Sequence, residues 1–224
     1  MSRPVAIVLG AGMGGRAVTK ALGSTYLVIV VDRREDLAHA AADAVGGEAA
    51  VVDLLDVDDL ARFRDDVIAR HGRIDAVVHL VGGWQGSTTV DRAALDAWDS
   101  IAPGVFGTVR TTTVAFRDAL IDAGGCYVMV SSTSATKPTA GNVAYATAKA
   151  AAETWVGGLA NSFKDTPARA VIVAVMALVD DAMRAADPDK AFKGYTDTSD
   201  LAAAIRGIVG GDAPNGARRD LTEA

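Results

Sequence analysis

The chain has 224 residues, half of them hydrophobic, which suits one α/β domain with an ordinary buried core. Its 22 Lys and Arg against 28 Asp and Glu give a formal net charge of −6, and the sequence contains no basic run. This balance offers no electrostatic basis for binding nucleic acid or an anionic membrane surface. The longest apolar stretch, 170–179, is far shorter than the ~18 residues of a membrane span.

Cysteine and histidine usage narrows the class of protein further. Cys126 is the only cysteine, which excludes an internal disulfide. The histidines lie on different predicted elements without the spacing of metal ligands, so no metal site is expected. No secretory signal precedes the first apolar run at Val5. The expected class is therefore a cytoplasmic protein of a reducing compartment.

Short apolar runs alternate with helical patterns along the chain. Buried strands are predicted at 5–9, 26–31, 49–52, 76–81, 127–130 and 171–175. Helices are predicted at about 16–22, between Asp32 and Gly46, and at 57–70, 105–123 and 144–163. Because no hairpin signal joins the strands, the predicted fold class is α/β, a single-domain Rossmann-type doubly wound parallel sheet over 1–224. Ligands bind such sheets beyond the carboxyl ends of the strands, where the loops converge.

A glycine cluster, Gly10-Ala-Gly12-Met-Gly14-Gly15, lies between the first strand and the helix that follows it. Glycine lets the backbone approach a pyrophosphate closely, and a helix N-terminus supplies free N–H groups. The spacing fits either GxGxxG or GxxxG, and alone it also fits a tight turn in an unrelated α/β protein. The strand–turn–helix context favours a dinucleotide site. Its expected residues are Gly10, Gly12, Met13, Gly14 and Gly15.

Asp32 ends the second predicted strand, 22 residues after Gly10. A carboxylate there can accept both adenosine-ribose hydroxyls and would repel a 2′-phosphate, which favours NAD(H) over NADP(H). Arg33 and Arg34 keep NADP(H) open, because a guanidinium could hold that phosphate. The alternative role of Asp32 is to cap the following helix.

Asp53 and Leu54 follow the third predicted strand and are expected beside the adenine of the cofactor. The Asp53 carboxylate could accept a hydrogen bond from the adenine amino group, or it could cap its own turn. The residue pattern alone favours neither role.

Tyr145 and Lys149 are four residues apart and share one face of a predicted helix. A nearby ammonium stabilises phenolate and would lower the tyrosine pKa, which assists proton transfer to a carbonyl oxygen. The alternative is a half-buried tyrosine beside a solvated lysine. Ser132, 13 residues before Tyr145, could orient a substrate oxygen, or it could belong with Ser134 to a polar turn.

Taken in this order, the glycine loop, Asp32, Ser132 and the YxxxK pair resemble the short-chain dehydrogenase/reductase family over nearly the whole chain. The resemblance implies that Ser132 orients the substrate and that Tyr145 is the general acid/base. It implies that Lys149 modifies the pKa of Tyr145 and binds the nicotinamide ribose. The segment ending in Val81-Gly82 resembles the family's Asn-Asn-Ala-Gly stretch, which places both residues at the cofactor.

The chain departs from the family pattern at several positions. His79 and Leu80 replace the two asparagines, and Gly104 stands where the family often has a catalytic asparagine. Gly82-Gly83-Trp84 and the segment after the sixth strand resemble the dihydropteridine-reductase-like branch, whose members are NADH-dependent reductases of quinonoid pterins. Trp84 is therefore a candidate for contacting a flat substrate, with anchoring of its loop as the alternative. Ser134 is a second candidate for substrate contact.

The leading functional hypothesis is an NAD(P)-dependent oxidoreductase acting on a carbonyl or a quinonoid/imine-like small molecule. The competing hypothesis is a non-catalytic dinucleotide-binding sensor or subunit, which the missing asparagine suggests. A binding module has no need of Ser132, Tyr145 and Lys149 at this spacing, so these residues favour the enzyme.

Two predicted helices, 105–123 and 144–163, carry apolar residues over more of their surface than one core-facing stripe requires. As in the family, this pair is expected to form the contact of a homodimer or homotetramer, with Phe116 or Trp155 near it. The charged segment 180–195 is expected to act as a lid over cofactor and substrate.

Overall fold

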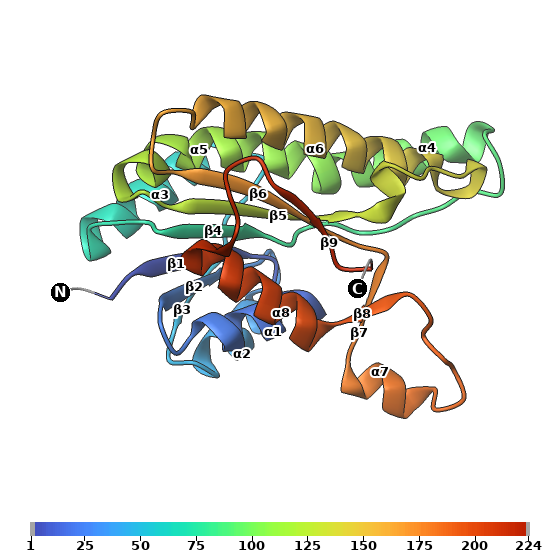
Figure 1. Ribbon diagram of the computed structural model, residues 1–224, viewed down its shortest axis with the longest axis horizontal. Coiled ribbons are helices and arrows are strands. Elements are labelled where there is room, and N and C mark those ends of the chain that lie inside the picture. Colours follow the sequence, from blue (N-terminus) through green and yellow to red (C-terminus); the bar gives the residue numbers. More distant parts are fainter. Residues whose placement is uncertain (1–2, 223–224) are drawn as a thin grey trace.

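The computed structural model describes residues 3–222 and has one central parallel sheet of seven strands (Figure 1). The spatial order is β3-β2-β1-β4-β5-β6-β9. The chain runs from β1 outward to β3, returns to the centre at β4 beside β1, and then builds the other half of the sheet outward. The strands are β1 Val5–Leu9, β2 Leu27–Val31, β3 Glu48–Ala50, β4 Ala76–His79, β5 Cys126–Ser132, β6 Arg169–Val175 and β9 Arg218–Asp220. The predicted α/β fold class, a doubly wound parallel sheet in one domain, is confirmed.

Helices cover both faces of this sheet (Figure 1). One face is covered by α1 Met13–Leu22, α2 Glu35–Asp43 and α8 Thr198–Gly207, and the other by α3 Val57–His71, α5 Thr108–Ala123 and α6 Val143–Ser162. Ala6 and Val8 face the first group, whereas Ile7 and Leu9 face the second. Burial on both faces explains why the central strands are continuous apolar runs. Within residues 3–222, none of the helices combines the length and apolar character that crossing a bilayer requires.

A helix that the sequence analysis missed, α4 Arg92–Ala102, precedes α5. The Asp91 side chain caps its start by accepting a hydrogen bond from the backbone N–H of Ala93 at 3.0 Å. A π-helical turn, Pro103–Gly107, joins α4 to α5. Proline and glycine in this turn are typical signals of a helix boundary, and they masked the continuity of the two helices.

The chain after β6 forms an outlying unit. The short strands β7 Ala177–Val179 and β8 Tyr195–Asp197 pair in parallel, with α7 Asp181–Ala186 between them. Figure 1 shows α7 projecting at the same end of the main sheet as α4. The Arg184 guanidinium binds the Asp197 carboxylate at 3.0 Å, and Phe192 is buried against Tyr195. The predicted lid segment therefore has its own helix and its own internal contacts.

Candidate active site

The glycine loop is shaped by close backbone approach. Gly10 has a φ of +101°, and its N–H donates to the carbonyl of Val31 on β2 at 2.8 Å. A Cβ on Gly15 would lie 1.8 Å from the carbonyl oxygen of Gly10, so this position requires glycine. A Cβ on Gly14 would lie 3.1 Å from Leu178, which places β7 against the loop. The loop is thus tied both to the sheet and to the outlying unit.

The first turn of α1 has no side-chain cap and borders free space. Helix α1 begins at Met13, three residues earlier than predicted, with Gly12 as a cap that makes no side-chain hydrogen bond. A Cβ on Gly12 would meet nothing within 4 Å. An uncapped helix N-terminus beside open space is the arrangement that binds a pyrophosphate. The residues present therefore fit a dinucleotide.

Asp32, just after β2, joins two loops. Its Oδ2 accepts a hydrogen bond from the N–H of Ala11 at 2.7 Å, and its Oδ1 accepts one from the N–H of Arg34 at 2.9 Å. The N-cap of α2 is Arg34, so the alternative that Asp32 caps this helix is wrong. The carboxylate keeps lone pairs for further donors, such as ribose hydroxyls.

The two arginines after Asp32 differ in their contacts. The Arg34 guanidinium binds Asp36 at 2.8 Å, on its own helix. Arg33 is exposed, and in the part of the chain that the structure describes its side chain makes no ion pair. Arg33 is therefore the more available of the two arginines for a 2′-phosphate.

Asp53 organises its own turn. Its Oδ1 accepts a hydrogen bond from the N–H of Leu55 at 2.9 Å, and its N–H donates to Asp59 at 3.0 Å. Leu54 is buried in the hydrophobic core, and its carbonyl accepts a hydrogen bond from the Thr111 hydroxyl. Leu54 therefore anchors the loop after β3 in the core, whereas Asp53 lies exposed in that loop.

Ser132, Tyr145 and Lys149 come together at the end of β5. Ser132 is the buried last residue of that strand, and its Oγ accepts a hydrogen bond from the N–H of Ser134 at 3.2 Å. Tyr145 lies in the first turn of α6, with Lys149 one turn later. The Lys149 Nζ lies 5.9 Å from the centre of the Tyr145 ring and donates to the carbonyl of Val130 at 2.8 Å.

The pKa of Tyr145 does not follow the expectation from the sequence. Burial raises the pKa of Tyr145 above its usual value, and a hydrogen bond with Ser132 opposes the rise. The predicted lowering of this pKa by Lys149 is not found, because removal of the phenol from water is the largest cause of the shift and only the hydrogen bond with Ser132 opposes it. Burial also lowers the pKa of Lys149 to about 8. At neutral pH the site therefore presents a protonated phenol beside an ammonium.

The neighbouring loops bring further predicted residues to this edge. A Cβ on Gly82 would lie 3.7 Å from the Lys149 Nζ, so the segment Val81-Gly82 passes beside the lysine. The Trp84 side chain is exposed, and a Cβ on Gly86 would lie 2.7 Å from its indole. Stacking of this indole on its own loop and contact with a ligand are compatible with each other.

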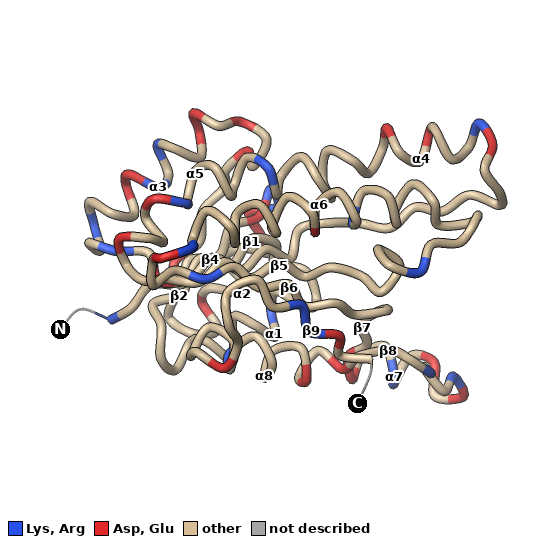
Figure 2. Tube along the Cα trace, turned by 45° about the horizontal axis from the view of Figure 1, so that its top comes forward, with Lys and Arg blue, Asp and Glu red and all other residues tan. Residues whose placement is uncertain are grey.

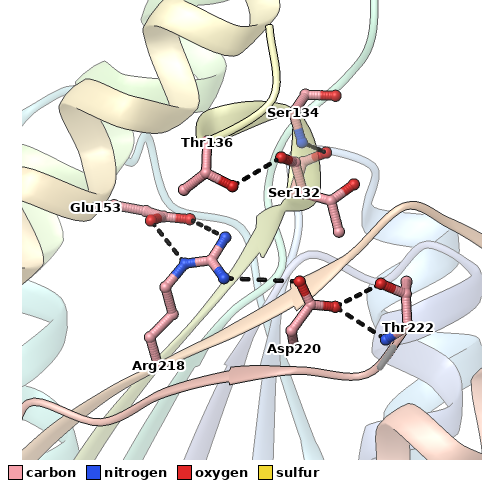
Figure 3. Close-up of polar contacts among 8 residues, drawn as sticks. Ser132, Ser134, Thr136, Glu153, Arg218, Asp220 and Thr222 are labelled. Carbon is pink, nitrogen blue, oxygen red and sulfur yellow. Dashed lines mark hydrogen bonds and ion pairs between the residues drawn. The ribbon is translucent and has the colours of Figure 1, made fainter. Parts of the chain in front are cut away.

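Ser134 has a partner of its own. Its Oγ accepts a hydrogen bond from the Asn142 side chain at 3.2 Å, which connects the turn after β5 with the start of α6. Figure 3 shows Ser132 and Ser134 in this turn, above the side chains of β9. Ser134 therefore holds the turn that carries Ser132.

His79 lies buried in the core, at the end of β4. The Thr108 hydroxyl donates to the carbonyl of Gly104 at 2.7 Å, so it accepts the hydrogen bond from His79 Nε2 at 3.0 Å. Nδ1 is then the unprotonated nitrogen, and within residues 3–222 it is buried without a partner. Burial, with the charge of Lys149, lowers the pKa of His79 to about 3. The imidazole is neutral at physiological pH.

Two charged residues near the site were missed by the sequence analysis. Glu153 lies one turn after Lys149 on α6, and Arg218 of β9 binds it at 2.9 Å. The spacing of Lys149 and Glu153 could have identified the first residue. Nothing local in the sequence brings Arg218 to α6.

Comparison with known proteins places this geometry in a family. Residues 4–190 match the family model described as short chain dehydrogenase. Comparison with curated proteins gives no significant match.

Among solved structures, a short-chain type dehydrogenase/reductase from Mycobacterium ulcerans has a TM-score of 0.87 at 20% identity, covering 99% of this chain and 89% of that one. A protein described as a short chain dehydrogenase from Shigella flexneri, complexed with NADP, has a TM-score of 0.85 at 18% identity, covering 98% and 97%. One described as a D-mannonate oxidoreductase from Haemophilus influenza, with bound NAD, has a TM-score of 0.83 at 17% identity, covering 98% and 94%. These likenesses show the fold, and the family match extends over most of the chain. The chain therefore belongs to the short chain dehydrogenase family of NAD(P)-dependent oxidoreductases.

Proposed function

We propose that the protein transfers hydride between NAD(H) and a carbonyl or quinonoid/imine-like carbon of a small molecule, with Tyr145 as the general acid/base. The observation that carries this proposal is the meeting of Ser132, Tyr145 and Lys149 beside Gly82, at the sheet edge that also holds the open N-terminus of α1. A binding module would need the second feature but not the first.

The cofactor assignment rests on two features of the nucleotide half of the site. The open first turn of α1 would hold the pyrophosphate, and Asp32 would accept the adenosine-ribose hydroxyls. Arg34 pairs with Asp36 on its own helix, and both side chains are exposed, so this pair competes only weakly with a 2′-phosphate. The Shigella flexneri neighbour is complexed with NADP and the Haemophilus influenza neighbour holds NAD, so the fold accepts either dinucleotide. The preference for NAD(H) therefore rests on Asp32.

The chain's own groups supply the proton chemistry. A bound nicotinamide cofactor supplies or accepts the hydride. Ser132 would hold the substrate oxygen or nitrogen by a hydrogen bond, and Tyr145 would donate its phenolic proton to that atom as the adjacent carbon is reduced. The phenolate that remains on Tyr145 would be stabilised by the Lys149 ammonium and reprotonated from solvent.

The protonation state of Tyr145 in the free site suits the reductive half of a reversible reaction. Burial raises the pKa of Tyr145, so the phenol keeps its proton at neutral pH and can act as an acid. Oxidation of an alcohol would need the phenolate first, at a cost that grows with the pKa of Tyr145. The free site is therefore ready to donate a proton to a substrate that is being reduced.

The substrate class follows from the loop after β4. Trp84 exposes 68% of its surface at the sheet edge that holds Tyr145. An exposed indole offers a flat apolar face for a conjugated ring. The resemblance of Gly82-Gly83-Trp84 to the dihydropteridine-reductase-like branch supports quinonoid pterins as one substrate class to test, beside simple ketones and quinones.

The segment 180–195 is proposed as a lid. It is bracketed by β7 and β8, and Leu178 of β7 packs against the position of Gly14 in the cofactor loop. Its charged surface, with the Arg184–Asp197 ion pair at its base, suits a cover that opens to water. Slower proteolysis within this segment in the presence of NADH and substrate is expected.

A homodimer formed by the outer face of α5 and α6 is proposed. Val114 is 61% exposed and Trp155 is 40% exposed on this face. Figure 2 shows α6 with few charged residues, which suits a surface covered by a second copy. Phe116 is fully buried in the core, so its expected place at the contact is wrong. A tetramer built from two such dimers is compatible with this face.

The second candidate function is a non-catalytic dinucleotide-binding module. Gly104 supports it, because this position offers no side chain to a proton relay and its carbonyl is occupied by Thr108. The two functions differ in turnover and not in cofactor binding.

The test is a panel of ketones, quinones and quinonoid pterins with NADH and with NADPH, followed by the loss of reduced nicotinamide absorbance. We expect turnover with at least one class and faster turnover with NADH. Tight NADH binding without turnover on any class would favour the binding module.

A further inference from the structure

A chain of ion pairs connects the C-terminal strand with the helix that carries Tyr145 and Lys149. Arg218 of β9 binds both oxygens of Glu153 on α6, through Nε at 2.9 Å and Nη2 at 3.2 Å (Figure 3). The side chains are 28% and 13% exposed, so water screens this bidentate pair only in part. Glu153 is thereby fixed one helical turn from Lys149.

The far side of Arg218 is also fixed. Asp220 lies 3.7 Å from its Nη1 and accepts hydrogen bonds from the backbone and the hydroxyl of Thr222, at 2.9 and 2.6 Å (Figure 3). Lys137, on the turn after β5, adds its charge to those that hold the pKa of Asp220 low. Alternating charges thus run from β9 to α6 and end beside Lys149.

The charge of Glu153 acts on Lys149 without direct contact between the two side chains. Its Nζ donates to the carbonyl of Val130, and within the described chain it makes no ion pair within 4 Å. Burial lowers the pKa of Lys149 to about 8, and the charge of Glu153 opposes this change. Tyr145 on the same helix and His79 on β4 also face Lys149, but the pKa of each keeps it neutral near pH 7.

We propose that Glu153 is a positioning residue that keeps Lys149 in its ammonium form, and that Arg218 sets how much of the Glu153 charge reaches it. The inference rests on the proposed function, because an ammonium at Lys149 matters only if Tyr145 transfers a proton. The C-terminal strand then contributes to the chemistry through electrostatics and not through contact with a ligand.

The test compares two variants that should move Lys149 in opposite directions. The side-chain nitrogens are labelled with ¹⁵N-lysine, the Nζ signal of Lys149 is assigned with Lys149→Arg, and its pH titration is followed by NMR. Glu153→Gln should lower the pKa of Lys149 by roughly 0.5–1 unit, because one partly screened charge is lost. Arg218→Gln should raise it, because the charge of Glu153 is no longer compensated.

Two further variants keep the test valid if Arg218→Gln does not fold. Asp220→Asn removes an equal charge that is separated from Lys149 by Arg218, so its effect should be smaller than that of Glu153→Gln. Asp66→Asn removes the same charge from an ion pair on α3, which packs on α5, and should leave Lys149 unchanged. Equal changes in the pKa of Lys149 in Glu153→Gln and Asp66→Asn would overturn the proposal. A change of that pKa in the same direction in Glu153→Gln and Arg218→Gln would also overturn it.

Activity separates this proposal from the proposed function. In every variant, the pKa at which kcat/KM falls on the alkaline side of its pH profile should match the pKa of Lys149 measured by NMR. If the NMR shifts occur while the pKa of the kcat/KM profile stays fixed, the catalytic part of the proposal is overturned. If the unaltered protein turns over no substrate, the proposed function fails while the NMR shifts still decide whether Glu153 and Arg218 control Lys149.

Discussion

The Oδ2 atom of Asp32 accepts a hydrogen bond from the backbone N–H of Ala11 at 2.7 Å. This bond ties the end of β2 to the glycine loop after β1, so the residue expected to choose the cofactor also shapes the loop that binds it. A substitution at Asp32 should therefore alter both the affinity and the selectivity for dinucleotides.

The first prediction concerns cofactor choice. The unaltered protein should bind NADH at least ~10-fold more tightly than NADPH, because the carboxylate of Asp32 accepts ribose hydroxyls and repels a phosphate. Asp32→Ala should narrow this gap in a fluorescence titration. Arg33→Gln serves as the matched variant and should weaken only NADPH binding. Tighter binding of NADPH by the unaltered protein would show that Arg33 decides the preference.

The second prediction uses two glycines of one loop. In Gly15→Ala the new Cβ would lie 1.8 Å from the Gly10 carbonyl oxygen, so the loop must distort, with a loss of about 1–3 kcal/mol or more in unfolding free energy. In Gly12→Ala the new methyl enters open space. Thermal unfolding should detect the first change and not the second, whereas NADH titration should detect both. Equal Tm values for the two variants would contradict the described loop geometry.

The third prediction concerns acid stability. The folded protein keeps His79 neutral with a pKa of about 3, whereas the unfolded chain binds a proton near pH 6.5. The unfolded state therefore gains protons first as the pH falls, and the stability that depends on neutral His79 is lost below pH 6.5. Between pH 7 and pH 5 this loss should be about 2 kcal/mol.

Denaturant unfolding of His79→Gln provides the comparison. The variant should be less stable at pH 7 but should lose less stability on acidification than the unaltered protein. His39→Gln, at an exposed histidine, is the matched control, and its unfolding free energy should depend on pH as that of the unaltered protein does. Parallel pH profiles for His79→Gln and the unaltered protein would refute the account of His79.

The fourth prediction concerns assembly. Val114→Glu places a charge on the outer face of α5, and it should convert the dimer into a monomer in size-exclusion chromatography with light scattering. Val90→Glu, at an equally exposed valine outside α5 and α6, should leave the dimer intact. A monomer for the unaltered protein at micromolar concentration would rule the dimer out.

Much of the fold was predictable because its central strands are continuous apolar runs followed by polar or glycine loops. Strand β1 was predicted with its observed bounds, and the strands β2, β4, β5 and β6 were found within a few residues. Strand β9 was missed because it consists of Arg218-Arg219-Asp220, which carries no apolar pattern. Its place in the sheet depends on pairing with β6, a contact that is distant in sequence.

The candidate site was predictable where local spacing carries the chemistry. The glycine loop, Asp32 and the Tyr145–Lys149 pair each follow from short-range patterns. The pKa of Tyr145 was not predictable, because the extent of its burial depends on the packed structure and burial is the largest cause of the raised pKa. The interaction of Glu153 with Arg218 required the three-dimensional fold for the same reason.

The most direct test of the central claim is the turnover of Tyr145→Phe with the best substrate of the panel. The variant should bind NADH nearly as tightly as the unaltered protein, and its kcat should fall by at least ~100-fold, the usual scale for loss of a general acid. Tyr26→Phe, which removes a hydroxyl at the far end of β2, should keep full turnover. Unchanged turnover of Tyr145→Phe would contradict the assignment of Tyr145 as the general acid.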